Sequence, residues 1–375
     1  MMRRYLLIVV CLLLGAVAST AQQHKTLREW GFPTGIFETG QYNAITDVPG
    51  VTVGHVTLIE GDSIRTGVTA IVPHQGDIFR NKVPAAIYVG NGFGKLAGVT
   101  QVRELGNIET PVILTNTLSV AAGMEGAIRY TLMQPGHERE NSVNAVVGET
   151  NDGRLNDTRG MHVTPQMVID AINKAHGGPV EQGNVGAGTG TICFGFKGGI
   201  GTSSRVLPES LGGYTIGVLV QTNYGGILEI DGVQVGQKLQ KHDFINHVRK
   251  TENVDGSCMM VVITDAPLDS RNLERVAKRA MMGMAKTGGI ASNGSGDYVI
   301  ALSVAPGNLI NDKAKMITST VLANSEMSSI FAATIEATAE ALWNSLFMAD
   351  SMTGRNGYHV DALPVEQVLE MLRNR

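Results

Sequence analysis

The sequence predicts an α/β or α+β fold with layered sheets. Runs of strand length that are rich in Val, Ile and Thr alternate with segments of helical periodicity from about residue 50 to the C-terminus. The 46 glycines occur without any low-complexity tract, which is typical of many tight turns in a compact chain. The hydrophobic content of 43% is enough for a large core, and no Pro-rich or Ser-rich linker divides the chain. A single domain is therefore expected.

The expected elements of the first half follow in order. Apolar runs bounded by turn residues predict strands at 51–58, 67–73, 85–89, 111–115 and 144–147, and helical periodicity predicts helices at 119–133 and 165–175. The second of these helices has clear start signals, with Thr164 as N-cap and Pro165 at the first position. Glycines crowd between residues 183 and 204, where we expect tight turns.

The second half continues the alternation after one polar interruption. Strands are predicted at 215–221, 257–264 and 297–304, and helices at 268–286, 325–349 and 364–372. Residues 228–253 are the most polar and charged part of the middle of the chain. We expect this segment to be an exposed connection that ends at Gly256.

Residues 1–21 have the composition of a secretory signal peptide. Arg3 and Arg4 precede an apolar run at 5–18, and small residues follow at 19–21. The run is too short to remain as a stable membrane anchor. Cleavage after Ala21 is expected to leave residues 22–375 as an exported protein, periplasmic or extracellular, with no membrane anchor.

Charge and cysteine usage exclude several classes of partner. The formal net charge is −4 and no basic run is present, so neither nucleic acid nor an anionic membrane surface is an expected partner. Beyond the leader only Cys193 and Cys258 remain, without Cys-x-x-Cys spacing, and the histidines form no zinc-binding pattern. No metal site is predicted. The count permits one disulfide between the two cysteines but does not imply it.

Two glycine-rich stretches match nucleotide-binding loops only in part. The stretch 186–191 ends in Thr191 where the dinucleotide motif needs Gly or Ala, and the stretch 195–202 lacks the Gly-Lys-Ser/Thr order of the phosphate loop. Close backbone packing is the simpler interpretation, and no cofactor is predicted. The sequence 294–296 approaches the elbow of serine hydrolases, but a predicted strand follows it instead of the required helix.

The bond between Gly256 and Ser257 has the residues needed for self-cleavage. Ser257 directly follows glycine at the head of a buried strand. Attack of its hydroxyl on the Gly256 carbonyl, followed by hydrolysis of the ester, would free an α-amine with an unperturbed pKa of about 7.7–8.0. A Gly-Ser pair before a strand is far more often an ordinary turn, so the dipeptide by itself does not decide the matter.

Acidic residues also gather at the end of the predicted strand at 144–147. Glu149 and Asp152 follow this strand, with Asn151 between them. Carboxylates at a strand end can bind a cationic group, act as general acid and base, or hold calcium. Polar capping of a loop accounts for the same residues equally well.

Several sequence blocks in order are more specific than any of these motifs. They lie at 48–55, 91–95, 104–117, 186–190, 198–204, 255–257, 292–297 and 352–355. With these blocks, nearly all of residues 22–375 resembles the family of L-aminopeptidase/D-esterases and β-peptidyl aminopeptidases. Members of that family are self-processing hydrolases with an N-terminal serine.

The resemblance implies a four-layer αββα sandwich, in which two stacked β-sheets are covered by helices. It implies Ser257 as the nucleophile of both self-cleavage and turnover. The bond between Gly256 and Ser257 would be cut, so that one catalytic domain becomes the fragments 22–256 and 257–375.

The resemblance also assigns roles around the nucleophile. Ser295 and Asp297 would orient Ser257 and its amine, although relatives carry Glu where Asp297 stands. Asn223 would stabilise the oxyanion, and Asn151 takes the place of a tyrosine that assists the oxyanion in one branch. Glu149 would anchor the free amine of the substrate.

The expected activity is that of a serine aminopeptidase. It would release N-terminal residues from small peptides or from amino-acid amides and esters through an acyl-enzyme, and the resemblance implies a homo-oligomer of two-fragment units. Two alternatives remain: an amidase or acyltransferase on the same fold, and a non-enzymatic exported binding protein. Known acyltransferases of this architecture use threonine, and a binding protein would remain one intact chain.

Overall fold

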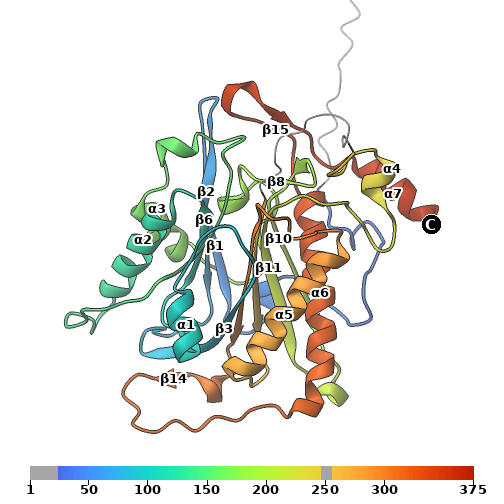
Figure 1. The fold of residues 1–375 in the computed structure, drawn as a ribbon. Coiled ribbons are helices and arrows are strands. Elements are labelled where there is room, and N and C mark those ends of the chain that lie inside the picture. Colours follow the sequence, from blue (N-terminus) through green and yellow to red (C-terminus); the bar gives the residue numbers. More distant parts are fainter. Residues whose placement is uncertain (1–23, 246–255) are drawn as a thin grey trace, which may run out of the picture.

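The computed structural model describes residues 24–245 and 256–375 (Figure 1). The expected signal peptide at 1–21, the end of the polar connection and Asp255 lie outside the described residues. Figure 1 shows two sheets stacked between two pairs of helices, so the predicted four-layer αββα sandwich is confirmed.

The first sheet has five strands in the order β1-β2-β6-β7-β4. Its members are β1 (Thr52–Glu60), β2 (Ile64–Val72), β6 (Val112–Asn116), β7 (Val146–Thr150) and β4 (Leu96–Ala97). β1 and β2 form an antiparallel hairpin, whereas β6 and β7 are parallel. The helix α2 (Val120–Leu132) connects these parallel strands, as such a crossover requires.

The second sheet has seven strands, six in one continuous order and the seventh, β5, paired with β3. Its main order is β10 (Ile200–Val206), β11 (Thr215–Asn223), β12 (Ser257–Thr264), β13 (Gly296–Ser303), β3 (Asn81–Gly92) and β14 (Ile310–Asn311), with β5 at Asn107–Ile108. β12 is central, antiparallel to β11 and parallel to β13. All eight residues of β12 are buried.

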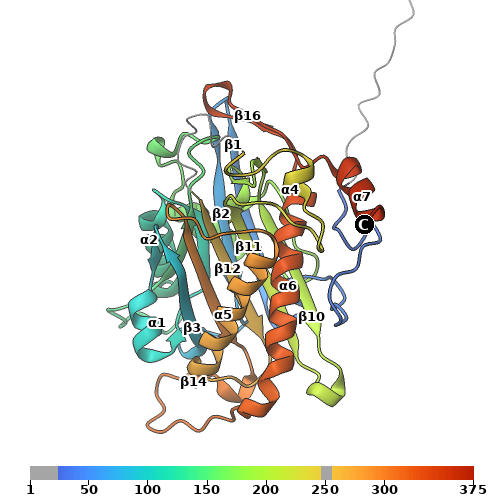
Figure 2. The same cartoon turned by 45° about the vertical axis from the view of Figure 1, so that its right-hand side comes forward.

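Helices cover the outer face of each sheet. α2 and α3 (Pro165–Asn173) pack on the five-stranded sheet, and α5 (Ser270–Lys286) and α6 (Met327–Phe347) pack on the seven-stranded sheet. Figure 2 shows α5 and α6 side by side over the sheet that contains β12. The shorter helices are α1 (Val99–Leu105), α4 (Val235–Lys238) and α7 (Val365–Arg373).

Helix starts agree with their sequence signals. The Thr164 side chain accepts a hydrogen bond from the Met167 amide at the start of α3, and Asp269 caps α5 by accepting from the Asn272 amide. Each such cap contributes about 1 kcal/mol.

Three apolar clusters fill the spaces between the four layers. The alternation of β12 divides its side chains between two of them. Met259 and Val261 face the other sheet, whereas Cys258 and Met260 face the helices. Full burial of each Met or Val side chain stabilises the fold by about 1.5–3 kcal/mol.

The glycine-rich segment combines close packing with a strand that was not predicted. A Cβ on Gly188 would lie 2.4 Å from the amide nitrogen of Ile200, so backbone packing explains that glycine. The expectation of tight turns within 183–204 is wrong from Ile200 onward, because β10 begins there. Its small side chains lack a strand-like pattern because α6 packs directly on it: a Cβ on Gly201 would lie 2.0 Å from the carbonyl oxygen of Ala341.

The prediction of an exposed connection over 228–253 is also wrong in its first part. Leu228, Ile230 and Val235 are fully buried and belong to the core under the helices. These apolar residues precede the charged run, and the high average polarity of residues 228–253 does not reveal them.

Candidate active site

Ser257 is the first residue of β12, and the two neighbouring strands place polar groups beside it. It pairs with Asn223, the last residue of β11, and with Gly296, the first residue of β13. Its side chain lies on the face of the sheet that carries Met259, directed between the two sheets, and the residue is only 5% exposed.

Asn223 is held in one orientation. Its side-chain oxygen accepts a hydrogen bond of 3.0 Å from the Ile192 amide. Ile192 belongs to the short hairpin of β8 (Ile192–Cys193) and β9 (Phe196–Lys197). Because this bond uses the oxygen, the Nδ2 donors are directed away from Ile192. Residues directly opposite each other in an antiparallel pair share one face, so Asn223 and Ser257 lie on the same side of the sheet.

Ser295 and Asp297 form a buried pair beside Gly256. The Ser295 hydroxyl donates to Asp297 Oδ1 at 2.8 Å, and its Oγ lies 3.2 Å from the position of a Cβ built on Gly256. The Asp297 side chain is therefore long enough to reach Ser295. Burial raises the pKa of the Asp297 carboxyl to about 6, although hydrogen bonds from Ser295 and from the Cys258 backbone oppose this shift. Its Oδ2 has no hydrogen-bond partner within the described parts of the chain.

Glu149 is a buried carboxylate near the end of β7, only 3% exposed. Its Oε1 accepts a hydrogen bond of 3.0 Å from the Lys95 amide, and its Oε2 accepts one from the Thr117 hydroxyl. The Lys95 ammonium lies 3.8 Å from Oε1 and its side chain is about half exposed. Two neutral donors therefore fix the carboxylate, while the ammonium remains at the edge.

Ser257 and Glu149 border a pocket of about 350 Å³. Its walls include Gly256, Ser257, Glu149, Asn151, Thr117, Gly294 and the loop at 92–95. Asn151 is exposed, and its side-chain oxygen accepts from the Gly153 amide at 2.9 Å. The structure therefore brings all the predicted site residues to one end of the two sheets, with Asn223 and the Ser295–Asp297 pair adjoining Ser257.

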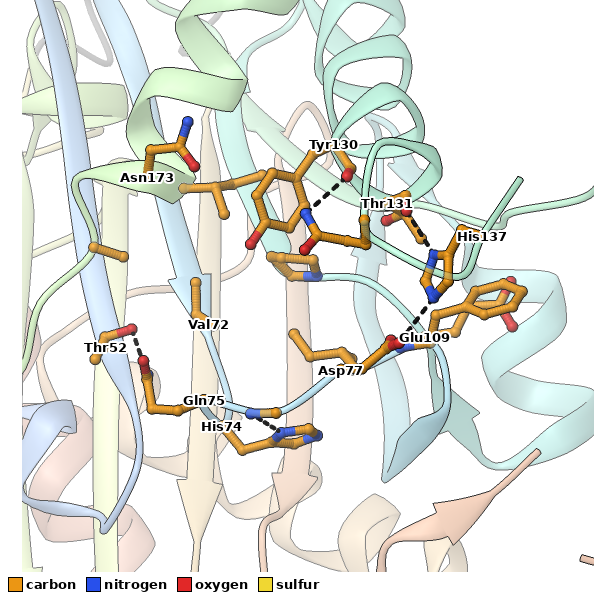
Figure 3. A pocket seen from close by; sticks show the side chains of 17 residues that line it. Thr52, Val72, His74, Gln75, Asp77, Glu109, Tyr130, Thr131, His137 and Asn173 are labelled. Carbon is orange, nitrogen blue, oxygen red and sulfur yellow. Dashed lines mark hydrogen bonds and ion pairs between the residues drawn. The ribbon is translucent and has the colours of Figure 1, made fainter. Parts of the chain in front are cut away.

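A second pocket lies at the opposite end of the five-stranded sheet (Figure 3). It has a volume of about 250 Å³ and contains none of the predicted site residues. His137 is almost fully buried there, with Nδ1 2.6 Å from the Thr131 carbonyl and Nε2 2.8 Å from Asp77 Oδ2. The ring therefore bridges the Thr131 carbonyl and the Asp77 carboxylate. This pair ties the segment after α2 to the loop after β2.

The described residues form neither a metal-binding cluster nor a disulfide. Within residues 24–245 and 256–375, no group of three or more His, Cys, Asp or Glu side chains is placed to hold a metal ion. Cys193 and Cys258 are buried and unpaired, so the disulfide permitted by their count does not form. No helix in these ranges has the length and apolar character required to cross a membrane.

Comparison with known proteins agrees with this geometry. The sequence pattern of Peptidase family S58 matches residues 43–360. The chain belongs to this family. A relative, the β-peptidyl aminopeptidase BapA of Sphingosinicella microcystinivorans, is 38% identical, and the match covers 98% of this chain and 96% of the relative. Membership in a peptidase family supports a hydrolase and disfavours a non-enzymatic binding protein.

Two solved structures extend the comparison to the fold. The PH0078 protein from Pyrococcus horikoshii OT3 superposes with a TM-score of 0.86 at 45% identity, over 93% of this chain and 99% of that protein. The L-aminopeptidase D-Ala-esterase/amidase from Ochrobactrum anthropi superposes with a TM-score of 0.84 at 35% identity, over 93% of this chain and 98% of that protein. That protein is a prototype of the serine aminopeptidases and a variant of the Ntn-hydrolase fold. This S58 peptidase therefore has the Ntn-hydrolase fold.

Sequence reasoning assigned no role to the two residues that hold Glu149. Lys95 and Thr117 lie in blocks that resemble the family, but they are far from Glu149 along the chain. The parallel register of β6 and β7 places Thr115 opposite Glu149 and so brings Thr117 within reach. No local sequence pattern predicts such a contact.

Proposed function

We propose that this S58 peptidase is a self-processing serine aminopeptidase whose nucleophile, Ser257, is released by cleavage of the bond between Gly256 and Ser257. The position of Ser257 is the main observation that supports the proposal. It begins a central strand with Asn223 on one side and Gly296 on the other, and it opens into a pocket whose wall holds a buried carboxylate.

Self-cleavage would use groups already in place. The Ser257 Oγ attacks the Gly256 carbonyl carbon, the peptide nitrogen leaves as the amine, and water hydrolyses the resulting ester. The Gly256 oxygen accepts a hydrogen bond of 3.1 Å from the Gly296 amide, which is placed to stabilise negative charge on that oxygen. The products are the fragments 22–256 and 257–375.

In turnover, the freed α-amine of Ser257 serves as base. It takes the hydroxyl proton, directly or through one water, while the hydroxyl attacks the substrate carbonyl, and then protonates the leaving amine. Asn223 donates to the oxyanion, and Asn151 at the pocket wall supplies the second donor. The Ser295–Asp297 pair keeps the amine and hydroxyl in register. Water then hydrolyses the acyl-enzyme.

Glu149 would select substrates with a free amine. A buried carboxylate held by two neutral donors keeps an acceptor for an ammonium group, and a blocked N-terminus would leave it unpaired. The relatives include a β-peptidyl aminopeptidase and an L-aminopeptidase D-Ala-esterase/amidase. We therefore assign as substrates small peptides, amides and esters with a free N-terminal amine, including those whose N-terminal residue is a β-amino acid. No cofactor or metal is needed for these steps.

Export and assembly belong to the same proposal. The charged and apolar pattern of residues 1–21 supports export to the periplasm or medium, and the resemblance to the family supports a homo-oligomer of two-fragment units. Fractionation and the mass of the native particle test these two parts.

Intact-mass measurement tests self-cleavage. Purified protein should give two masses that correspond to 22–256 and 257–375, and Ser257→Ala should give one. Cys258→Ser, at the neighbouring residue, serves as the matched control and should still be cut. A single uncut mass for the unsubstituted protein would contradict the proposal.

Substrate blocking tests the role of Glu149. The processed enzyme should cleave a β-alanyl amide and leave its N-acetyl form nearly untouched. Equal rates on both forms would show that Glu149 does not anchor the amine.

A further inference from the structure

We infer that the pocket accepts a substrate whose N-terminal residue carries a carboxylate on the same carbon as its amine. Such a substrate is a β-aspartyl peptide or amide, and Lys95 is the residue that selects it. This inference rests on the proposed function, because it takes Glu149 as the amine anchor and Ser257 as the nucleophile.

The first support is that Lys95 and Glu149 offer opposite charges on one pocket wall. Both residues line the pocket that contains Ser257. The Lys95 Nζ lies 3.8 Å from Glu149 Oε1, which is beyond hydrogen-bonding distance but close enough for two adjacent groups of one ligand to contact both.

The second support is that the ammonium is not needed to hold Glu149. The carboxylate already accepts hydrogen bonds from the Lys95 amide and the Thr117 hydroxyl. Among the described residues, Glu149 is the charged partner of the Lys95 ammonium, and the Lys95 side chain is 53% exposed. Its donors are therefore accessible to a ligand.

The chemistry of the ligand follows from this spacing. An ammonium bound at Glu149 places a second positive charge beside Lys95, which is unfavourable unless the ligand brings a negative charge to the same place. In a β-aspartyl residue, one carbon carries both the amine and a carboxylate, and that carbon is β to the scissile carbonyl. Such a residue is a β-amino acid with a carboxylate substituent, so it matches both charges and the proposed substrate class.

The test compares two chromogenic substrates that differ only in this carboxylate: aspartic acid β-(p-nitroanilide) and β-alanine p-nitroanilide. Processed wild-type enzyme should hydrolyse both, with the higher kcat/KM for the β-aspartyl compound. Lys95→Met should lower the ratio of the two kcat/KM values by about 10- to 100-fold, and Lys95→Arg should largely restore it. Lys313→Met, an exposed lysine elsewhere, should leave the ratio at the wild-type value.

The outcomes separate the inference from the function on which it rests. Turnover of the β-alanyl compound without turnover of the β-aspartyl compound overturns the inference and leaves the aminopeptidase proposal standing. An equal loss on both substrates in Lys95→Met also overturns it, because Lys95 would then only support Glu149. Hydrolysis of neither substrate by processed enzyme counts against the proposed function itself.

Discussion

Asp297 is the site residue whose environment departs most clearly from that of a free side chain. Its carboxyl is fully buried, and its pKa is raised to about 6 chiefly by burial. The ionised carboxylate accepts the hydrogen bond from Ser295 more strongly than the neutral carboxyl does, so the arrangement around Ser257 is held most firmly above that pH.

This predicts the acid side of the activity profile. Activity should rise with pH through about 6 as Asp297 ionises, and again as the Ser257 amine loses its proton near its unperturbed pKa of about 7.7–8.0. Asp297→Asn keeps the shape, should lower kcat by roughly 10²-fold, and should remove the step near pH 6. Measurement of kcat/KM from pH 4.5 to 9 in the wild type and in Asp297→Asn tests this assignment. A step near pH 6 that persists in Asp297→Asn belongs to another group.

The same ionisation affects stability with a definite sign. The folded-state pKa of Asp297 lies above the ordinary value of 3.8, so the folded protein binds more protons than the unfolded one between about pH 4 and 6. The stabilising contribution is fully present below pH 4 and is lost as pH rises to 6. The free energy of unfolding of Asp297→Asn, measured in urea at pH 4.5 and 7.5, should lack this decrease. If Asp297→Asn and the wild type show the same change with pH, the assignment is wrong.

At the scale of elements, the hairpin of β8 and β9 positions the predicted oxyanion donor. The Lys197 side chain is fully buried and its Nζ donates to the carbonyl oxygens of Gly188 at 3.0 Å and Gly198 at 2.7 Å. Burial lowers the pKa of Lys197 to about 7. This side chain closes the hairpin whose Ile192 amide orients Asn223.

Lys197→Met should therefore lower kcat with little change in KM. We expect a loss of about 10-fold or more, bounded by the 10²–10³-fold typical of losing an oxyanion donor. Lys241→Met is the control, because Lys241 packs on Phe196 of the same hairpin without bonding these carbonyls. Steady-state kinetics measure both. An unchanged kcat in Lys197→Met would show that the hairpin does not depend on this side chain.

The packing of α6 on β10 makes another prediction at this scale. Gly201 leaves no room for a methyl group against Ala341, so Gly201→Ala should cost about 1–3 kcal/mol of unfolding free energy through overpacking. Gly177→Ala is the matched control, because a Cβ there meets no atom within 4 Å. Urea denaturation of the two variants measures the difference. Equal stabilities would mean that the helix shifts away from the sheet without cost.

At the scale of the whole molecule, the two expected fragments are interleaved. β12 and β13 come from 257–375, but they lie between β11 and β3, which come from 22–256. Apolar side chains from both fragments also share the core between the sheets, Leu219 with Val261 among them.

Cleavage should therefore leave the fold intact. The two fragments should elute as one species in gel filtration under native conditions and separate only in denaturant. The uncut Ser257→Ala chain provides the reference elution volume. Native separation of the fragments would contradict this account of the core.

The amino-acid sequence alone determined most elements and their order, because strands and helices leave local periodicities and caps, as at Thr164 and in the apolar run that follows Ser257. The resemblance then named the site residues. Tertiary structure alone decided that Asn223 faces Ser257 and that Lys95 and Thr117 border Glu149, because strand register joins distant residues without any local signal. The same reason explains the strand beginning at Ile200, whose small side chains are required by the close packing of α6 against it.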